Sequence, residues 1–176
     1  MAQIFTIFGA TGTQGGSIME AVLKSPTLSQ KYKLRGVTRD ASKIPSKALG
    51  EGGVEMVEAD LNDPDSVIKA AQGSALIFGV TDFHASGSAS VEAAQGRAIA
   101  DAASKANAFL IWSTLPSIVE ISGGILTKAA LYEGKASVDK YIKSLGIPSV
   151  SFVPASYMDL FKSSAFWGPT KASLCF

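Results

Sequence analysis

The sequence alternates between short apolar or β-branched runs and longer stretches in which apolar positions recur every three or four residues. Six short runs predict strands, at residues 3–8, 34–38, 54–58, 75–80, 109–112 and 149–153. The run from Ala75 to Val80 is continuously apolar, which is typical of a strand buried on both faces. Strands that alternate with helices indicate parallel pairing through crossover connections. We therefore expect an α/β fold with a doubly wound parallel sheet between two layers of helices.

Helix signals support this division of the chain. Asp63 and Pro64 predict the N-cap and first residue of a helix, whose expected buried stripe is Val67, Ile68 and Ala71. Residues 88–107 carry small side chains at steps of three and four, which predict a face that packs closely on the sheet: Val91, Ala94, Ala98 and Ala102. Residues 128–145 predict a helix that ends at Gly146 and buries Leu131, Val138, Ile142 and Leu145.

A glycine-rich segment joins the first predicted strand to the first predicted helix. Three glycines at a spacing of three permit a tight turn and a close approach of phosphate to backbone N–H groups, and the following helix contributes its N-terminal donors. The pattern differs from G-x-G-x-x-G, and a purely structural turn is the alternative. The strand before it and the helix after it favour a dinucleotide site. The predicted cofactor-binding residues of this turn are Gly9, Thr11, Gly12, Thr13, Gln14 and Gly15.

Composition and charge narrow the class of protein. The chain has 176 residues, of which 47% are hydrophobic, which suits one domain with a substantial core. We assign residues 1–161 to that domain and residues 162–176 to a divergent tail. A net charge of +1 without a basic block argues against direct nucleic-acid binding, and no apolar run is long enough for a membrane span. We expect a soluble, cytoplasmic protein without a Cys- or His-based metal site, since Cys175 and His84 are single.

The end of the second predicted strand carries the residues that would select the dinucleotide. Arg39 can grip the 2′-phosphate of NADP bidentately, and Lys43 supplies a second positive charge. The alternatives are a solvated loop arginine at this position and an NAD ribose bound by Asp40. We favour NADP.

Two further strand ends border the same predicted crevice. Asp60 and Leu61 are candidates to face the adenine, although Asp60 could equally cap its own loop. Thr81 and Phe83 follow the fourth strand, where the strand order of such folds reverses and ligands bind. His84 beside them is interpreted as an exposed loop histidine in preference to an acid or base.

Candidate catalytic residues follow the fifth strand. Ser113, Tyr132 and Lys135 together would suit hydride transfer, but Tyr132 and Lys135 are three residues apart rather than the four that align along a helix. Lys135 alone, next to Gly134, which permits close approach, is the better candidate. The alternative is a solvated helix lysine.

Together these residues resemble the NmrA-like family, an atypical branch of the short-chain dehydrogenase/reductase superfamily, from about residue 3 to residue 161. The resemblance rests on segments 9–16 (GATGTQGG), 36–40 (GVTRD), 59–61 (ADL), 79–83 (GVTDF), 133–135 (EGK) and 154–158 (PASYM). It implies a Rossmann-type sheet of order 3-2-1-4-5-6 and NADP(H) as cofactor.

The resemblance also implies roles for single residues. Arg39 would bind the 2′-phosphate, Thr81 and Phe83 would line the crevice, and Lys135 and the segment from Pro154 to Tyr157 would flank the nicotinamide. Two departures from the family pattern matter. Leu131 stands where main-branch members have a tyrosine four residues before the lysine, and family members usually continue well past this point to close a substrate pocket.

Two functions compete on this evidence. One is a non-catalytic NADP(H) sensor that regulates a protein partner, in the cytoplasm or in the nucleus. The other is an NADPH-dependent reductase of a small carbonyl or unsaturated substrate, with Lys135 orienting the cofactor and Ser113 or Tyr157 near the reacting atom. Absence of the substrate half that family members carry would leave apolar surface exposed, which predicts a homodimer, with Phe161, Phe166 and Trp167 as candidate contacts.

Overall fold

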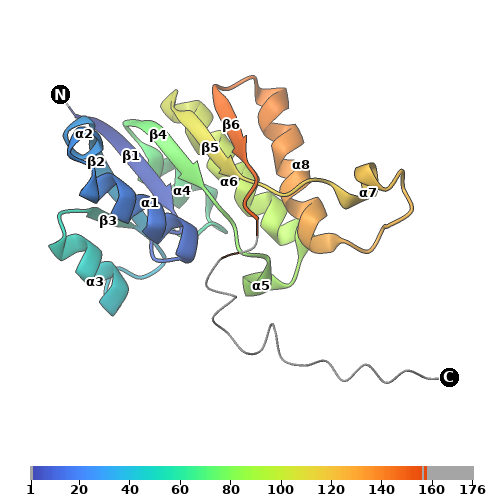
Figure 1. Cartoon of the computed structure of the whole chain (residues 1–176), viewed down its shortest axis with the longest axis horizontal. Coiled ribbons are helices and arrows are strands. Elements are labelled where there is room, and N and C mark those ends of the chain that lie inside the picture. The colour runs from blue at the N-terminus through green and yellow to red at the C-terminus, as the bar shows by residue number, and fades with distance from the viewer. Residues whose placement is uncertain (1, 156, 158–176) are drawn as a thin grey trace.

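The computed structural model describes residues 2–155 and 157, and its centre is a parallel sheet (Figure 1). The strands run in the order β3-β2-β1-β4-β5-β6, and every neighbouring pair is parallel. Their bounds are β1 (Gln3–Phe8), β2 (Tyr32–Thr38), β3 (Glu55–Glu58), β4 (Ser74–Gly79), β5 (Phe109–Ser113) and β6 (Ser149–Phe152). The ends of the predicted strands agree with those of the observed strands to within two residues. The predicted Rossmann-type order 3-2-1-4-5-6 is confirmed.

Helices connect the strands and form a layer on each face of the sheet (Figure 1). One apolar cluster joins α1 and α3 to the sheet, and the other joins α4, α6 and α8 to its opposite face. The helices are α1 (Thr13–Lys24), α2 (Pro26–Lys31), α3 (Ile44–Glu51), α4 (Pro64–Ala71), α5 (Phe83–Ser86), α6 (Ala89–Ala106), α7 (Ile118–Ile121) and α8 (Ala130–Leu145). The predicted three-layer α/β/α architecture is therefore confirmed, while the short helices α2, α3, α5 and α7 were not predicted.

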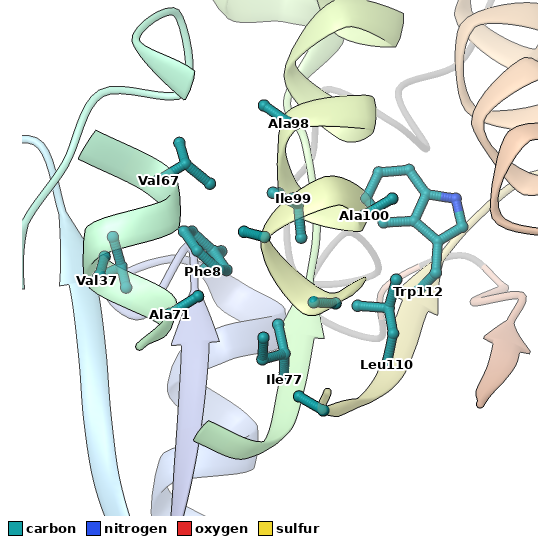
Figure 2. Packing of buried hydrophobic residues seen from close by; sticks show 14 of the residues in the cluster. Phe8, Val37, Val67, Ala71, Ile77, Ala98, Ile99, Ala100, Leu110 and Trp112 are labelled. Atoms are coloured by element: carbon teal, nitrogen blue, oxygen red, sulfur yellow. The ribbon is translucent and has the colours of Figure 1, made fainter. Parts of the chain in front are cut away.

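The central strands contribute side chains to both clusters. In β1, Ile7 belongs to the cluster under α1, whereas Phe8 belongs to the cluster under α4 and α6. In β4, Phe78 belongs to the cluster under α1, and Ile77 belongs to the cluster under α4 and α6. Figure 2 shows Phe8 and Ile77 in the cluster under α4 and α6, with Phe8 close to Val67 of α4. Burial on both faces explains why these strands are apolar throughout.

The predicted N-cap of α4 is confirmed, but the residues that α6 buries differ from the predicted stripe. The Asp63 side chain caps α4 by accepting a hydrogen bond from the Asp65 N–H at 3.2 Å. In α6, Val91 and Ala94 are exposed, and burial follows other positions: Glu92, Ala93, Gly96, Ala98, Ile99, Ala100, Ala102 and Ala103. The physical reason is that α6 contacts α4 and α8 as well as the sheet, so one stripe cannot describe its burial.

The edge formed by β6 is much less covered than the centre of the sheet. Val150 and Phe152 are half exposed and pair in register with Ile111 and Ser113 of β5. Ile111 packs on the cluster under α1, so Val150 and Phe152 lie on that same face. Phe109 is also exposed there. Within residues 2–155, no helix covers this part of the sheet. Among all helices of the described residues, none is long and apolar enough to cross a membrane. Phe161, Phe166, Trp167 and the tail from residue 162 lie outside the described residues.

Candidate functional site

The glycine turn links the carboxyl end of β1 to the N-terminus of α1. The Gly12 N–H donates to the Gly9 carbonyl at 2.9 Å, and Gly9 has a φ of 70°, which favours glycine. A Cβ on Gly15 would overlap the Gly9 carbonyl oxygen and lie 2.7 Å from its carbon, and neither backbone atom can yield cheaply. Among the described residues, no side chain caps the N-terminus of α1. The turn is therefore tightly built and presents backbone N–H donors, as a phosphate cradle requires.

A cavity of about 690 Å³ runs past this turn along the carboxyl ends of the strands. Every residue predicted to bind the cofactor or to act in catalysis lines this one cavity: Gly9, Thr11, Gly12, Thr13, Gln14, Gly15, Arg39, Asp60, Leu61, Thr81, Phe83, Ser113, Lys135, Pro154 and Tyr157. Tyr132 is not among the lining residues, whereas Leu131 is. The cavity thus has two ends, one beside Arg39 after β2 and the other beside Ser113 and Lys135.

At the Arg39 end, the charged side chains differ in whether they already bond to other groups of the protein. Arg39 is exposed, and no carboxylate of the described residues forms an ion pair with it. The Asp40 carboxylate instead accepts from the Ser42 hydroxyl at 2.6 Å and from the Ser42 N–H at 2.8 Å. These two bonds hold the pKa of Asp40 below its ordinary value. Asp40 therefore stabilises its own turn, and Arg39 with Lys43 offers the available positive charge.

Asp60 also bonds within its own loop. Its Oδ1 accepts from the backbone N–H and the side-chain amide of Asn62, each at 2.9 Å. Gln95 of α6 donates to Asn62 Oδ1 at 3.0 Å and fixes this loop against the helix. Leu61 is half buried and packs on the cluster under α4 and α6. An apolar side chain next to a fixed polar turn is suited to hold a flat ring.

At the other end, a chain of hydrogen bonds crosses the cavity. The buried Ser113 hydroxyl donates to Gln14 Oε1 at 2.8 Å, and Gln14 Nε2 donates to the Tyr157 hydroxyl at 2.6 Å. These residues come from β5, from the first turn of α1 and from the segment after β6. Their side chains therefore connect the glycine turn with both candidate reacting residues.

Lys135 lies in the wall at this end and is only 8% exposed, so its interpretation as a solvated helix lysine is wrong. Its Nζ donates to the Thr81 carbonyl at 2.6 Å and to Thr81 Oγ1 at 2.9 Å, and it forms an ion pair with Glu92 Oε1 at 2.8 Å. Thr81 Oγ1 in turn donates to Glu92 Oε1 at 2.9 Å. The space for Glu92 depends on Gly134, where a Cβ would lie 2.9 Å from Glu92 Oε2.

Sequence reasoning missed Glu92 entirely. The available signal was an acidic residue in the first turn of a helix that is otherwise rich in alanine. His84, by contrast, is exposed, as its preferred interpretation holds, and its ring packs edge-on against Phe83 with 5.9 Å between the ring centres.

The sheet order, the glycine turn and the cavity at the strand ends define a protein of the Rossmann-fold class, with a cradle for a phosphate-bearing ligand. Within that class, the chain belongs to the NmrA-like family, whose model matches residues 1–172.

Several relatives by sequence are fungal proteins described as oxidoreductases of this family. The chain is 27% identical to the NmrA-like family domain-containing oxidoreductase ptmS of Penicillium ochrochloron, over 93% of this chain and 50% of that protein. It is 31% identical to the oxidoreductase FrzB of Cladobotryum sp., over 83% of this chain and 44% of that protein. The chain thus spans about half the length of the curated relatives it matches.

Solved structures agree on the fold. Triphenylmethane reductase of Citrobacter sp., crystallised with NADP(H), superimposes with a TM-score of 0.75 at 21% identity, over 93% of this chain and 53% of that one. NmrA, a negative transcriptional regulator crystallised with NADP, gives a TM-score of 0.70 at 20% identity, over 86% of this chain and 45% of that one. One neighbour is an enzyme and the other a regulator, so the shared fold does not select between these functions.

Proposed function

We propose that this protein binds NADP(H) in the cavity at the carboxyl ends of the strands. The observation that carries the proposal is the continuity of the cavity, which joins the glycine turn to Arg39 at one end and to Lys135 at the other. NADP-bound neighbours of the same fold support it.

The residues fit the parts of the cofactor in order. The pyrophosphate lies on the glycine turn and the N-terminus of α1. Arg39 and Lys43 bind the 2′-phosphate, and Leu61 and Asp60 border the adenine. Lys135 and the residues around it then flank the nicotinamide: Thr81, Phe83, Ser113, Pro154 and Tyr157.

Calorimetric titration of the protein with NADP, NADPH, NAD and NADH tests this proposal. We expect tighter binding of the phosphorylated pair, and we expect Arg39→Glu to weaken NADP binding far more than NAD binding. Lys31→Glu is the matched control, since it reverses an exposed positive charge at the end of α2, outside the cavity lining. Equal loss of NADP and NAD in Arg39→Glu would mean that the 2′-phosphate is bound elsewhere.

We further propose that the bound cofactor makes the protein a sensor, whose affinity for a protein partner changes with occupancy or redox state. Leu131 in place of the family tyrosine supports a role without hydride transfer. This role belongs in the cytoplasm, or in the nucleus if the partner regulates transcription.

The second candidate is an NADPH-dependent reductase. Ser113, Lys135 and Tyr157 at one end of the cavity favour it. NADPH oxidation measured across aldehydes, quinones and enones distinguishes the two functions. Turnover that is lost in Lys135→Ala supports the reductase, and tight binding without turnover on any substrate class leaves the sensor.

We also propose that the protein is a homodimer in which a second copy covers the exposed face of β5 and β6. The apolar side chains Phe109, Val150 and Phe152 are each about half exposed there, and such surface is commonly buried by a partner. Light scattering with a monomer mass at all concentrations would refute the dimer.

A further inference from the structure

Glu92 is the most completely buried charged side chain of the described residues, at 0% exposure. It rises from the first turn of α6 and meets Lys135 of α8 and Thr81 after β4. The distances from Lys135 Nζ to Thr81 Oγ1, from Thr81 Oγ1 to Glu92 Oε1 and from Glu92 Oε1 back to Nζ are 2.9, 2.9 and 2.8 Å. Glu92 therefore anchors a closed triangle of polar atoms in the cavity wall.

The stability of the fold does not explain why a carboxylate is buried at position 92. Its second oxygen, Oε2, is buried without a hydrogen-bond partner among the described residues, and an unpaired buried acceptor costs free energy. Buried ion pairs are often no more stable than apolar side chains of similar volume. Gly134 must also lack a side chain to leave room for Oε2. These costs point to a role for the negative charge itself.

The charge of Glu92 cancels that of Lys135. An ammonium group has three N–H donors, and here Thr81 O, Thr81 Oγ1 and Glu92 Oε1 accept from Nζ. The pair lies at the end of the cavity opposite Arg39, with Nζ also 6.0 Å from the ring centre of Trp112. At this end the cavity wall is thus polar but carries no net charge from the pair.

We propose that Glu92 determines how the site discriminates between the two redox forms of the cofactor. The inference rests on the proposed NADP(H) binding, with the nicotinamide at the Lys135 end. The oxidised nicotinamide ring carries a positive charge, whereas the reduced ring is neutral. By neutralising Lys135, Glu92 removes a repulsion that only the oxidised ring would feel, and so allows the protein to respond to NADP⁺ as well as to NADPH.

This role predicts a direction that a packing defect would not produce. Glu92→Gln keeps the shape of the side chain but leaves the Lys135 charge uncompensated, so NADP⁺ should bind more weakly relative to NADPH. The expected change in the ratio of the two Kd values is roughly tenfold, the order expected for one unit charge acting across a partly buried site. The double variant Glu92→Gln/Lys135→Gln removes both charges and should return the ratio to that of the original protein.

The experiment is calorimetric titration of the whole chain and of both variants with NADP⁺, NADPH and adenosine 2′,5′-bisphosphate. The bisphosphate lacks the nicotinamide and reports whether the Arg39 end and the fold remain intact. Its Kd should stay constant in Glu92→Gln. Glu120→Gln is the matched control, because it removes one negative charge from an exposed side chain outside the cavity.

The possible results separate the two proposals. Binding of all three ligands by the original protein, with a shifted NADP⁺ to NADPH ratio in Glu92→Gln alone, supports the inference. An unchanged ratio, or an equal loss of all three ligands, overturns it while NADP(H) binding stands. If the original protein binds none of the ligands, the proposed function is wrong, and the role of Glu92 falls with it.

Discussion

The two ends of the cavity are built in different ways. At the Arg39 end, the acidic side chains of Asp40 and Asp60 bond within their own loops, and Arg39 itself is exposed. At the opposite end, buried Ser113 and Lys135 bond to residues far away in the chain. We therefore expect substitutions at the Arg39 end to leave the fold intact, whereas substitutions at the opposite end also change stability.

We expect the largest loss of stability when the ion pair between Lys135 and Glu92 at the buried end is broken. Lys135→Met leaves the Glu92 carboxylate buried without its positive partner, so the free energy of unfolding should fall by about 3–5 kcal/mol. Urea denaturation followed by circular dichroism measures this loss. Arg39→Met is the matched control at the exposed end and should change stability by less than about 0.5 kcal/mol. Similar losses in both variants would remove the distinction between the ends.

A smaller effect is expected at the turn that both ends share. In Gly15→Ala, the new methyl group collides with the Gly9 carbonyl, and overpacking of this kind typically costs about 1–3 kcal/mol. We expect weaker titration by NADPH and by adenosine 2′,5′-bisphosphate alike, since the turn serves both halves of the site. Gly16→Ala is the matched control, because its methyl group would lie at an ordinary 3.8 Å from the Ala10 carbonyl. Full binding by Gly15→Ala would show that the turn can relax.

The smallest effect concerns pH at the exposed end. The Ser42 hydroxyl and N–H keep the pKa of Asp40 below its unfolded value. Its contribution to stability is therefore fully present above the ordinary carboxyl pKa and is lost as the pH falls through the lowered one. Acid titration of stability should show a slightly smaller decline in Asp40→Asn than in the original protein. An identical acid profile in the two proteins would mean that the Ser42 bonds do not persist in solution.

Much of the fold could be predicted because its signals are local. Apolar runs, the cap at Asp63 and the stop at Gly146 each depend on a few neighbouring residues, and each agrees with the structure. The buried face of α6 could not be predicted from one periodic stripe, because α4, α8 and the sheet all contact this helix. Val91 and Ala94 were misplaced for that reason.

In the candidate site, too, residues with local sequence signals could be predicted, and a residue whose partners are distant in the chain could not. Arg39 and the glycine turn follow directly from strand ends, so the sequence pattern identified them. Glu92 did not, because its partners Thr81 and Lys135 belong to other elements and only the packing of α6 against α8 brings the charges together. A buried charge among small residues is invisible to periodicity, although its cost to the fold marks it once the structure is known.

The strand order has a consequence for the order in which the site can form during synthesis. Every side chain of the Arg39 end belongs to residues 9–61, whereas the opposite end needs segments up to Tyr157. On a ribosome, the Arg39 end of the cavity therefore emerges first, with β1 still lacking its neighbour β4. The contact between Glu92 and Lys135 waits until α8 has left the exit tunnel, so the end of the cavity beside Lys135 is the last part to be completed.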